Sequence, residues 1–217
     1  GLEAAHMVVA PTAAMGDALA TEYGLRVRPL VIPNACADGD AAREPNWTSK
    51  EPVVLTAGRA WDHAKNVAAL CAIASRVTWP IYVAGSQRTP EGVDCPLPGV
   101  RALGCLTPAD LSAWFRRASI YVLPARYEPF GLSVLEAARA GCALVLGDIA
   151  SLRENWDGVA VFVPPDDTGA LASVLRQLID DPEERFDRGK RAFARADAFS
   201  IDRTAREYLR VYEGLMA

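Results

Sequence analysis

Short apolar segments alternate with amphipathic, helix-length segments along most of the chain, and this alternation restricts the possible folds more than any other feature. The short segments have the length and composition of buried strands, and the longer ones have helical periodicity. Strands and helices that alternate through short connections form a parallel sheet covered by helices on both faces. We therefore expect an α/β fold of this kind.

The expected strands are 7–10, 27–33, 53–57, 81–84, 100–103, 120–123, 143–146 and 159–163. The expected helices are 12–23, 65–77, 108–118, 130–141, 150–155, 167–180, 183–197 and 201–215. The segment 35–52 is polar, contains two prolines and has no apolar period, so it is expected to be a linker between domains. Residues 1–34 before it are too few for a domain, whereas 53–200 are enough for one.

Composition excludes several classes of protein. The chain has 217 residues, of which 51% are hydrophobic, so it can bury a core. Its net charge of −4 argues against nucleic acid as the main partner. It contains no long apolar run and does not begin like a signal peptide, so we expect no membrane span. The five cysteines are odd in number and never spaced as Cys-x-x-Cys, which favours a reducing cytoplasm.

Two glutamates, Glu128 and Glu136, bracket the expected start of one helix. We expect Glu128 at the carboxyl end of the preceding strand and Glu136 one to two turns into the helix. Pro129 suits a first helical turn, where no amide donor is needed. The amides of 130–133 would then form an anion site, for which phosphate is a common ligand. An anion site between two carboxylates that accept hydroxyl groups fits a nucleotide sugar.

A second group of residues follows the expected strand 53–57. Gly58 is expected to open a tight turn, with Arg59 and Lys65 close behind it. Open parallel sheets bind ligands at this edge, and a guanidinium group with an ammonium group suits a diphosphate. An isolated arginine and lysine in a loop are more often simply solvated. Their position after a strand end, together with the anion site at 130–133, favours binding.

These motifs resemble the retaining glycosyltransferases of family four (glycosyl transferases group 1), which have the GT-B architecture. The resemblance rests on Gly58-Arg59 with Lys65-Asn66, and on Glu128 and Glu136 with Pro-Phe-Gly-Leu after the first glutamate. The stretches 31–34, 83–85, 140–143 and 161–164 also fit, so that it covers nearly the whole chain. It implies a Rossmann-like, doubly wound sheet that forms the C-terminal, donor-binding half of a GT-B enzyme.

The resemblance also assigns roles. Arg59 and Lys65 would hold the donor diphosphate, Glu128 would lie beside the donor sugar with an open catalytic role, and Glu136 would bind the ribose hydroxyls. These cations and the helix N-terminus would stabilise the leaving diphosphate without a metal or other cofactor. The donor would be a nucleotide diphosphate sugar such as a UDP- or GDP-sugar. The implied donor-binding set is Gly58, Arg59, Lys65, Gly104, Leu106, Glu128, Phe130, Gly131, Leu132, Ser133 and Glu136.

The family pattern has two such domains, and this chain resembles mainly the second. Residues 1–34 resemble the tail of the acceptor domain, and 201–217 resemble the helix that crosses back to it. We therefore expect the acceptor site to lie in a missing N-terminal domain, and this fragment alone to bind nucleotide but to be inactive. Two alternatives stay open: a nucleotide-sugar epimerase of GT-B architecture, and a nucleotide-binding module without catalytic activity.

Weaker signals remain ambiguous. Asp38 and Asp40 form an Asp-x-Asp, a metal–diphosphate signature of another glycosyltransferase architecture, but they lie in the expected linker. His63 could approach the donor or be solvated. Glu154 could contact the sugar or cap a helix. Arg101 would border the base together with 104–106.

Overall fold

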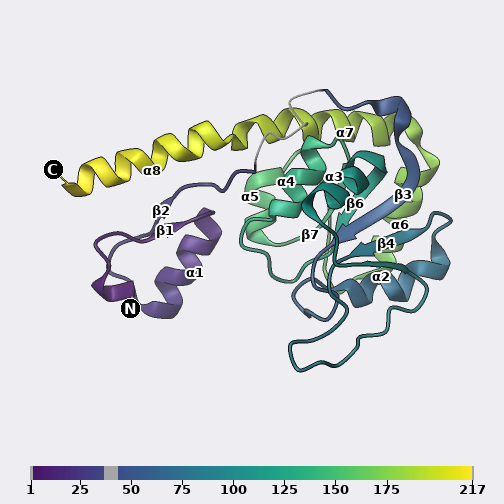
Figure 1. The fold of residues 1–217 in the computed structure, drawn as a ribbon, viewed down its shortest axis with the longest axis horizontal. Coiled ribbons are helices and arrows are strands. Elements are labelled where there is room, and N and C mark those ends of the chain that lie inside the picture. Colours follow the sequence, from purple (N-terminus) through teal and green to yellow (C-terminus); the bar gives the residue numbers. More distant parts are fainter. Residues whose placement is uncertain (1, 37–43, 217) are drawn as a thin grey trace.

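The computed structural model describes residues 2–36 and 44–216. In this part of the chain, a 6-stranded sheet forms the main body, and every neighbouring pair of strands in it is parallel (Figure 1). Its order is β5-β4-β3-β6-β7-β8. The strands are β3 (Glu51–Ala57), β4 (Ile81–Ala84), β5 (Arg101–Gly104), β6 (Ala118–Leu123), β7 (Ala143–Gly147) and β8 (Val161–Val163).

The strand order reverses at the centre of the sheet. The chain runs from β3 outward to β4 and β5, then returns to the other side of β3 and continues through β6, β7 and β8. This is a doubly wound, Rossmann-like sheet, as the family resemblance implied. In such sheets, ligands bind beyond the carboxyl ends of the strands where the order reverses. The loops that follow β3 and β6 therefore flank the expected binding crevice.

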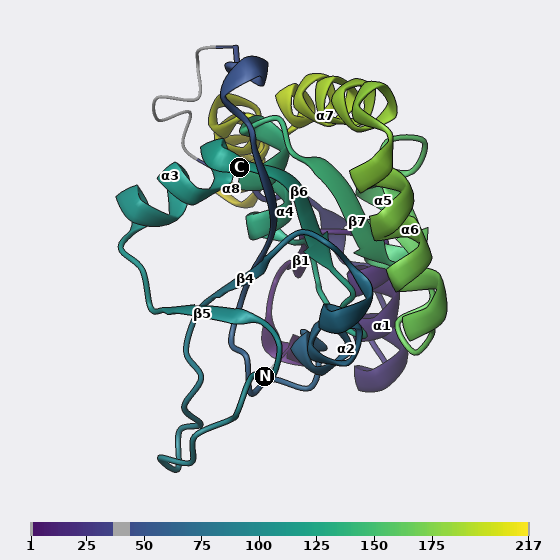
Figure 2. The same cartoon turned by 90° about the vertical axis from the view of Figure 1, so that its right-hand side faces the viewer.

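Helices cover both faces of the sheet (Figure 2). The first face packs against α3 (Pro108–Arg117), α4 (Leu132–Arg139), α5 (Ala150–Trp156) and α7 (Pro182–Ala196). The second face packs against α2 (Val67–Ile73) and α6 (Thr168–Asp180). Strand β6 is buried along its whole length and, apart from Ser119, carries apolar or aromatic side chains, as central parallel strands do.

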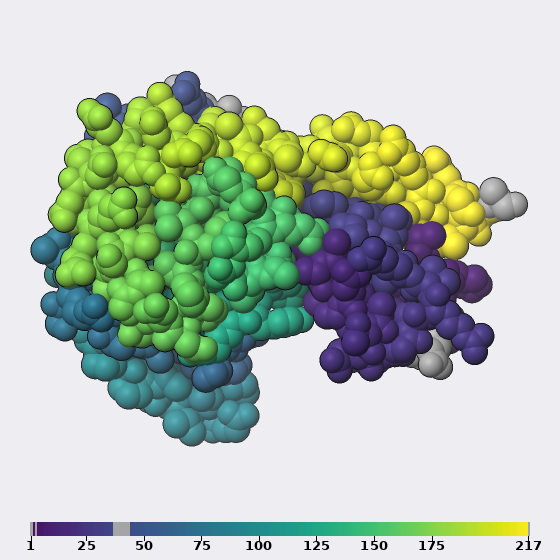
Figure 3. All heavy atoms as spheres, turned by 180° about the vertical axis from the view of Figure 1, so that it is seen from behind, coloured from purple at the N-terminus to yellow at the C-terminus, as the bar shows by residue number. Residues whose placement is uncertain are grey.

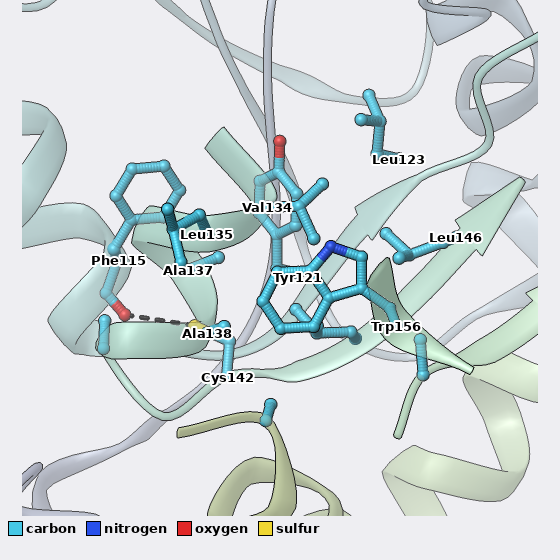
Figure 4. Close-up of a cluster of buried hydrophobic side chains, with 14 of the residues drawn as sticks. Phe115, Tyr121, Leu123, Val134, Leu135, Ala137, Ala138, Cys142, Leu146 and Trp156 are labelled. Carbon is cyan, nitrogen blue, oxygen red and sulfur yellow. Dashed lines mark hydrogen bonds between the residues drawn. The ribbon is translucent and has the colours of Figure 1, made fainter. Parts of the chain in front are cut away.

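The side chains of β6 alternate between the two cores. Tyr121 and Leu123 belong to the core under α4, whereas Ile120 and Val122 belong to the core under α2 and α6. Figure 4 shows the first core, in which the rings of Tyr121 and Trp156 lie beside the residues of α4. Cys142 is buried there, as expected of a small core residue.

A smaller N-terminal unit, residues 2–34, stands beside the main body (Figure 1). It contains a short 3-10 helix (Leu2–Ala4), strand β1 (Val9–Ala10), helix α1 (Ala13–Tyr23) and strand β2 (Leu30–Val31). The two strands form a parallel pair. Helix α8 (Ile201–Met216) extends along this unit, and the Thr204 hydroxyl donates to the Pro33 carbonyl oxygen at 2.9 Å (Figure 3).

Several boundaries differ from those expected. The helix expected at 65–77 starts at Val67, because Asn66 has a left-handed φ of 57°, and three 3-10 residues (Ala74–Arg76) follow it. The helix expected at 130–141 starts at Leu132, because Gly131 has a φ of 89°. Pro129 is therefore not in a first helical turn. Glu128 lies in the loop after β6 and not at the end of that strand.

The remaining differences are small. The strands expected at 7–10 and 27–33 are each shortened to two residues, Val9–Ala10 in β1 and Leu30–Val31 in β2. These are the residues at which the two strands pair with each other. A 3-10 helix (Trp47–Ser49) precedes β3, and another (Asp197–Phe199) follows α7. In the described ranges, no helix combines the length and apolar character needed to cross a membrane.

Close packing of α7 gives a first prediction. A Cβ atom at Gly189 would lie 2.5 Å from the carbonyl oxygen of Gly141 and 3.0 Å from the ring of Trp47. We expect Gly189→Ala to lower the free energy of unfolding by about 1–3 kcal/mol, because α7 must shift away. Urea denaturation measures the change. The matched control is Gly214→Ala, since a Cβ atom there would meet nothing within 4 Å. An equal loss in both variants would contradict the account.

Candidate functional site

Three loops are tied together at the carboxyl edge of the sheet by one side chain. The amide group of Asn66 donates to the carbonyl oxygens of Pro124 and Pro165, each at 2.8 Å. Asn66 is buried, and its left-handed backbone is one that asparagine tolerates better than most residues. A backbone hydrogen bond from Arg126 to Ala64 adds a second link at 2.9 Å. The loops that follow β3 and β6 therefore hold each other in place.

Glycines let the strand ends approach closely. A Cβ atom at Gly85 would lie 2.0 Å from the carbonyl oxygen of Gly58, so no larger residue fits. The Gly58 amide donates to Ala84 at 2.8 Å, and the Gly85 amide donates to Gly104 at 2.8 Å. Gly58 and Gly104, both expected to lie near the ligand, are thus parts of one tight backbone arrangement at the ends of β3, β4 and β5.

Lys65 and Glu128, which the sequence places far apart, form an ion pair. Their side chains are only 19% and 11% exposed, so both are held in place. The second carboxylate oxygen of Glu128 accepts from the Gly131 amide at 3.0 Å. The carbonyl oxygen of Glu128 accepts from the Ser151 hydroxyl at 2.5 Å. The Glu128 carboxylate therefore binds an amide just before α4 with one oxygen and pairs with Lys65 through the other.

Arg59 is less restrained. Its side chain is 60% exposed and pairs with Asp62, and its guanidinium lies 5.2 Å from the centre of the Trp61 ring. Burial acts to raise the pKa of Asp62, but hydrogen bonds from Arg59 and the Ala64 amide together lower it. In the described residues, the recorded contacts of Arg59 are with this loop and not with Lys65 or Glu128. The structure thus brings Arg59 to the same edge without joining it to the ion pair.

The start of α4 supplies backbone donors. The Gly131 amide is engaged by Glu128, but the amides of Leu132 and Ser133 donate no hydrogen bond within the described part of the chain. The Leu132 side chain is exposed. Phe130, in contrast, is only 3% exposed, and its ring packs edge-on against Phe199, so its side chain belongs to the core. Two consecutive amides are therefore available to an anion.

Glu136 lies just over one turn into α4, as the spacing predicted. It is half-buried, and no hydrogen bond or ion pair to another described residue is recorded for its carboxylate. Burial raises the pKa of this carboxyl group. Nearby, the Tyr121 hydroxyl donates to Ser133 at 2.7 Å, and burial, together with the charges of Glu128 and Glu136, raises the pKa of Tyr121. The negative charges of Glu128 and Glu136 therefore both disfavour ionisation of the Tyr121 hydroxyl.

The other expected residues are more peripheral. Leu106 is half-buried against the core under α4. Arg101 donates to the Tyr82 hydroxyl at 2.7 Å, and His63 is exposed. Asp38 and Asp40 lie outside the described residues. Glu154 accepts hydrogen bonds from the first amides of α1, so it caps a helix, though one on the N-terminal unit and not its own.

Sequence reasoning missed a cavity of about 620 Å³ beside α2. Its lining is mainly apolar and includes Trp61, Val67, Cys71, Cys95 and Leu97, and also Asp62, Asn66 and Arg126 of the loops after β3 and β6. The available signal was the connection 85–100 between β4 and β5, which forms no helix although crossovers between parallel strands usually contain one. The outer surface of α2 is consequently covered by a loop.

Comparison with known proteins identifies the family. Residues 51–181 match the model for glycosyl transferases group 1, which is more than half of the chain. The chain therefore belongs to this family. It is 42% identical over 88 residues to a glycogen synthase of Mycobacterium tuberculosis, which is 40% of this chain and 21% of that enzyme. It is 37% identical over 105 residues to a D-inositol 3-phosphate glycosyltransferase of Arthrobacter, which is 48% of this chain and 25% of the relative.

Solved structures agree on the fold. Anabaena HepE, crystallised with UDP and glucose, matches with a TM-score of 0.82 and 17% identity, over 97% of this chain and 64% of that one. The fold is that of one half of a GT-B glycosyltransferase, as the sequence predicted. The chain spans only about a fifth to a quarter of the curated relatives described above.

The raised pKa of Glu136 gives a second prediction. Because burial disfavours its charged form, the folded state loses stability as the pH rises from the unfolded pKa through the folded pKa. Glu136→Gln should therefore be more stable than the wild type at about pH 8, and the difference should shrink toward about pH 4. Urea denaturation across this range measures it. Glu213→Gln, on the exposed side of α8, is the control. A variant less stable than the wild type at high pH would contradict the assignment.

Proposed function

We propose that this chain is the donor-binding domain of a glycosyltransferase that uses a nucleotide diphosphate sugar. The observation that carries the proposal is the convergence of Lys65, Glu128 and the start of α4 at the point where the strand order reverses. Ligand binding is favoured there by topology, and an anion is favoured by the cation and the helix N-terminus.

The diphosphate would bind between Lys65 and the amides of Leu132 and Ser133. Lys65 is restrained by Glu128, so little ordering is needed when it turns toward a phosphate oxygen. Arg59 would swing from Asp62 to complete the site. The Arg59 side chain is 60% exposed and so has room to move, and Asp62 would keep its hydrogen bond from the Ala64 amide at 2.9 Å.

Bond cleavage would develop negative charge on the diphosphate. Fixed donors directed at that charge stabilise the transition state, and losing one typically costs ~3 kcal/mol of barrier. Lys65, Arg59 and the α4 amides would supply these donors, which is why we propose a reaction independent of a metal. Glu128 would lie beside the sugar, and transfer would retain the anomeric configuration, as the family resemblance implies.

Glu136 would accept hydrogen bonds from the ribose hydroxyls. Its carboxylate is half-buried and has no recorded partner in the described ranges, and ligand hydroxyls would compensate for that burial.

UDP is the natural first probe, because the structurally similar HepE was crystallised with it. Gly104 and Leu106 would border the base.

The acceptor would bind to a further domain, since the matched structures extend well beyond this fold. The fragment alone would bind nucleotide without transferring sugar. We place the protein in the cytoplasm and in carbohydrate biosynthesis, and its cysteines at 71, 95, 105 and 142 form no disulfide. Turnover by the parent protein distinguishes sugar transfer from epimerisation and from binding without catalysis.

Removal of the central cation tests the proposal. Lys65→Ala should weaken UDP binding by about 1.5–3 kcal/mol, which is roughly 10- to 150-fold, because charge-assisted hydrogen bonds are lost. Arg59→Ala should have a smaller effect, because that side chain is more exposed. Isothermal titration calorimetry measures both.

The matched control is Lys190→Ala, on the exposed side of α7. It should bind UDP like the wild type. If folded Lys65→Ala and Arg59→Ala proteins both kept the wild-type affinity, the diphosphate assignment would be wrong.

A further inference from the structure

The N-terminal unit begins its helix directly against the loop that carries Glu128. Thr12 is fully buried, and its hydroxyl donates to the carbonyl oxygen of Pro129 at 2.9 Å. The same hydroxyl accepts from the Met15 amide at 3.1 Å and so caps α1. The Thr12 hydroxyl therefore supplies a hydrogen-bond partner both to an amide at the start of α1 and to a carbonyl oxygen in the loop before α4. Figure 3 shows the N-terminal unit lying against the main body.

A carboxylate from the main body completes this junction. The two oxygens of Glu154, on α5, accept from the amides of Ala13 at 2.7 Å and Ala14 at 3.0 Å. The first amides of a helix have no partner within it, and a negative charge there is favourable. The bonded residues are 140 and 141 positions apart in the sequence, so this cap joins two separate parts of the chain.

The loop of Glu128 is consequently held from two sides. Ser151, also on α5, donates to the carbonyl oxygen of Glu128, and Thr12 donates to the next carbonyl oxygen, that of Pro129. Proline has no amide hydrogen, so its carbonyl is its only backbone hydrogen-bonding group. Helix α5 therefore anchors this loop directly through Ser151, and through Glu154 it anchors the helix that carries Thr12.

We propose that Thr12 and Glu154 are positioning residues of the nucleotide site. They fasten α1 to α5 and to Pro129, and this keeps Glu128 and the amides of Leu132 and Ser133 in their binding geometry. The inference rests on the proposed function, because it concerns the same site. Neither side chain needs to touch the nucleotide.

Two nearly isosteric variants test the proposal. Thr12→Val removes the hydroxyl, and Glu154→Gln replaces one of the two acceptor oxygens and removes the charge. Each should lower UDP affinity about 3- to 10-fold in calorimetry. Uridine, which lacks the diphosphate, should lose less affinity than UDP. A purely structural defect would weaken both ligands equally, so this comparison isolates positioning.

The controls lie on α1 away from the junction. Thr21→Val removes a hydroxyl that bonds within the helix, to Asp17 at 2.9 Å, and Glu22→Gln changes an exposed carboxylate. Both should bind UDP and uridine like the wild type. If folded Thr12→Val and Glu154→Gln proteins did the same, or lost both ligands equally, the proposal would be overturned.

Hydrogen exchange gives an independent measurement. In the wild type, UDP should slow exchange at the Ala13 and Ala14 amides, since coupling between two sites is reciprocal. Unchanged exchange in UDP-bound protein would overturn the proposal even if the variants failed to fold. If the wild type did not bind UDP, the proposed function would fail. In that case, exchange of the Ala13 and Ala14 amides that is faster in Glu154→Gln than in the wild type would still show that Glu154 holds α1 against α5. An unchanged exchange rate would overturn that attachment as well.

Discussion

The buried amide group of Asn66 is the interaction on which the site depends. Its two hydrogen bonds fix the loops after β3, β6 and β8 relative to one another, just beyond the carboxyl edge of the sheet. Lys65 precedes it in the chain, and the loop that leads to Glu128 follows one of its acceptors, Pro124. A left-handed backbone at this position ends the first loop and starts α2. Asn66 therefore fixes the loop that carries Lys65 relative to the loop that leads to Glu128.

The pairing of Lys65 with Glu128 changes how the site should be understood. The family resemblance implied that the lysine binds the phosphates and that the glutamate lies beside the sugar. In the structure each restrains the other, and both are mostly buried. Such mutual restraint lowers the ordering cost when a ligand binds. In the proposed complex, the lysine would also keep this carboxylate from lying unpaired beside an anionic diphosphate.

The fold, and the placement of Glu128 and Glu136 around the start of a helix, could be predicted because the signals were local. The continuous apolar run of β6 indicated a strand buried on both faces, and the spacing of Glu128 and Glu136 placed them around a helix start. The exact start of α4 could not be predicted, because it depends on the left-handed Gly131. The role of Glu154 could not be predicted either, because its partners are distant amides of α1. The cavity beside α2 was missed because its only sequence signal was the lack of a helix in the connection 85–100, and this lack does not show that a cavity forms.

The most direct test is a nitrogen–proton correlation NMR titration of the chain with UDP, which compares the candidate site with the cavity beside α2. The account predicts the largest shifts at the amides of Gly58, Leu132 and Ser133, at the point where the strand order reverses. Shifts concentrated instead at 67–72 and 95–98, which line the cavity beside α2, would contradict it.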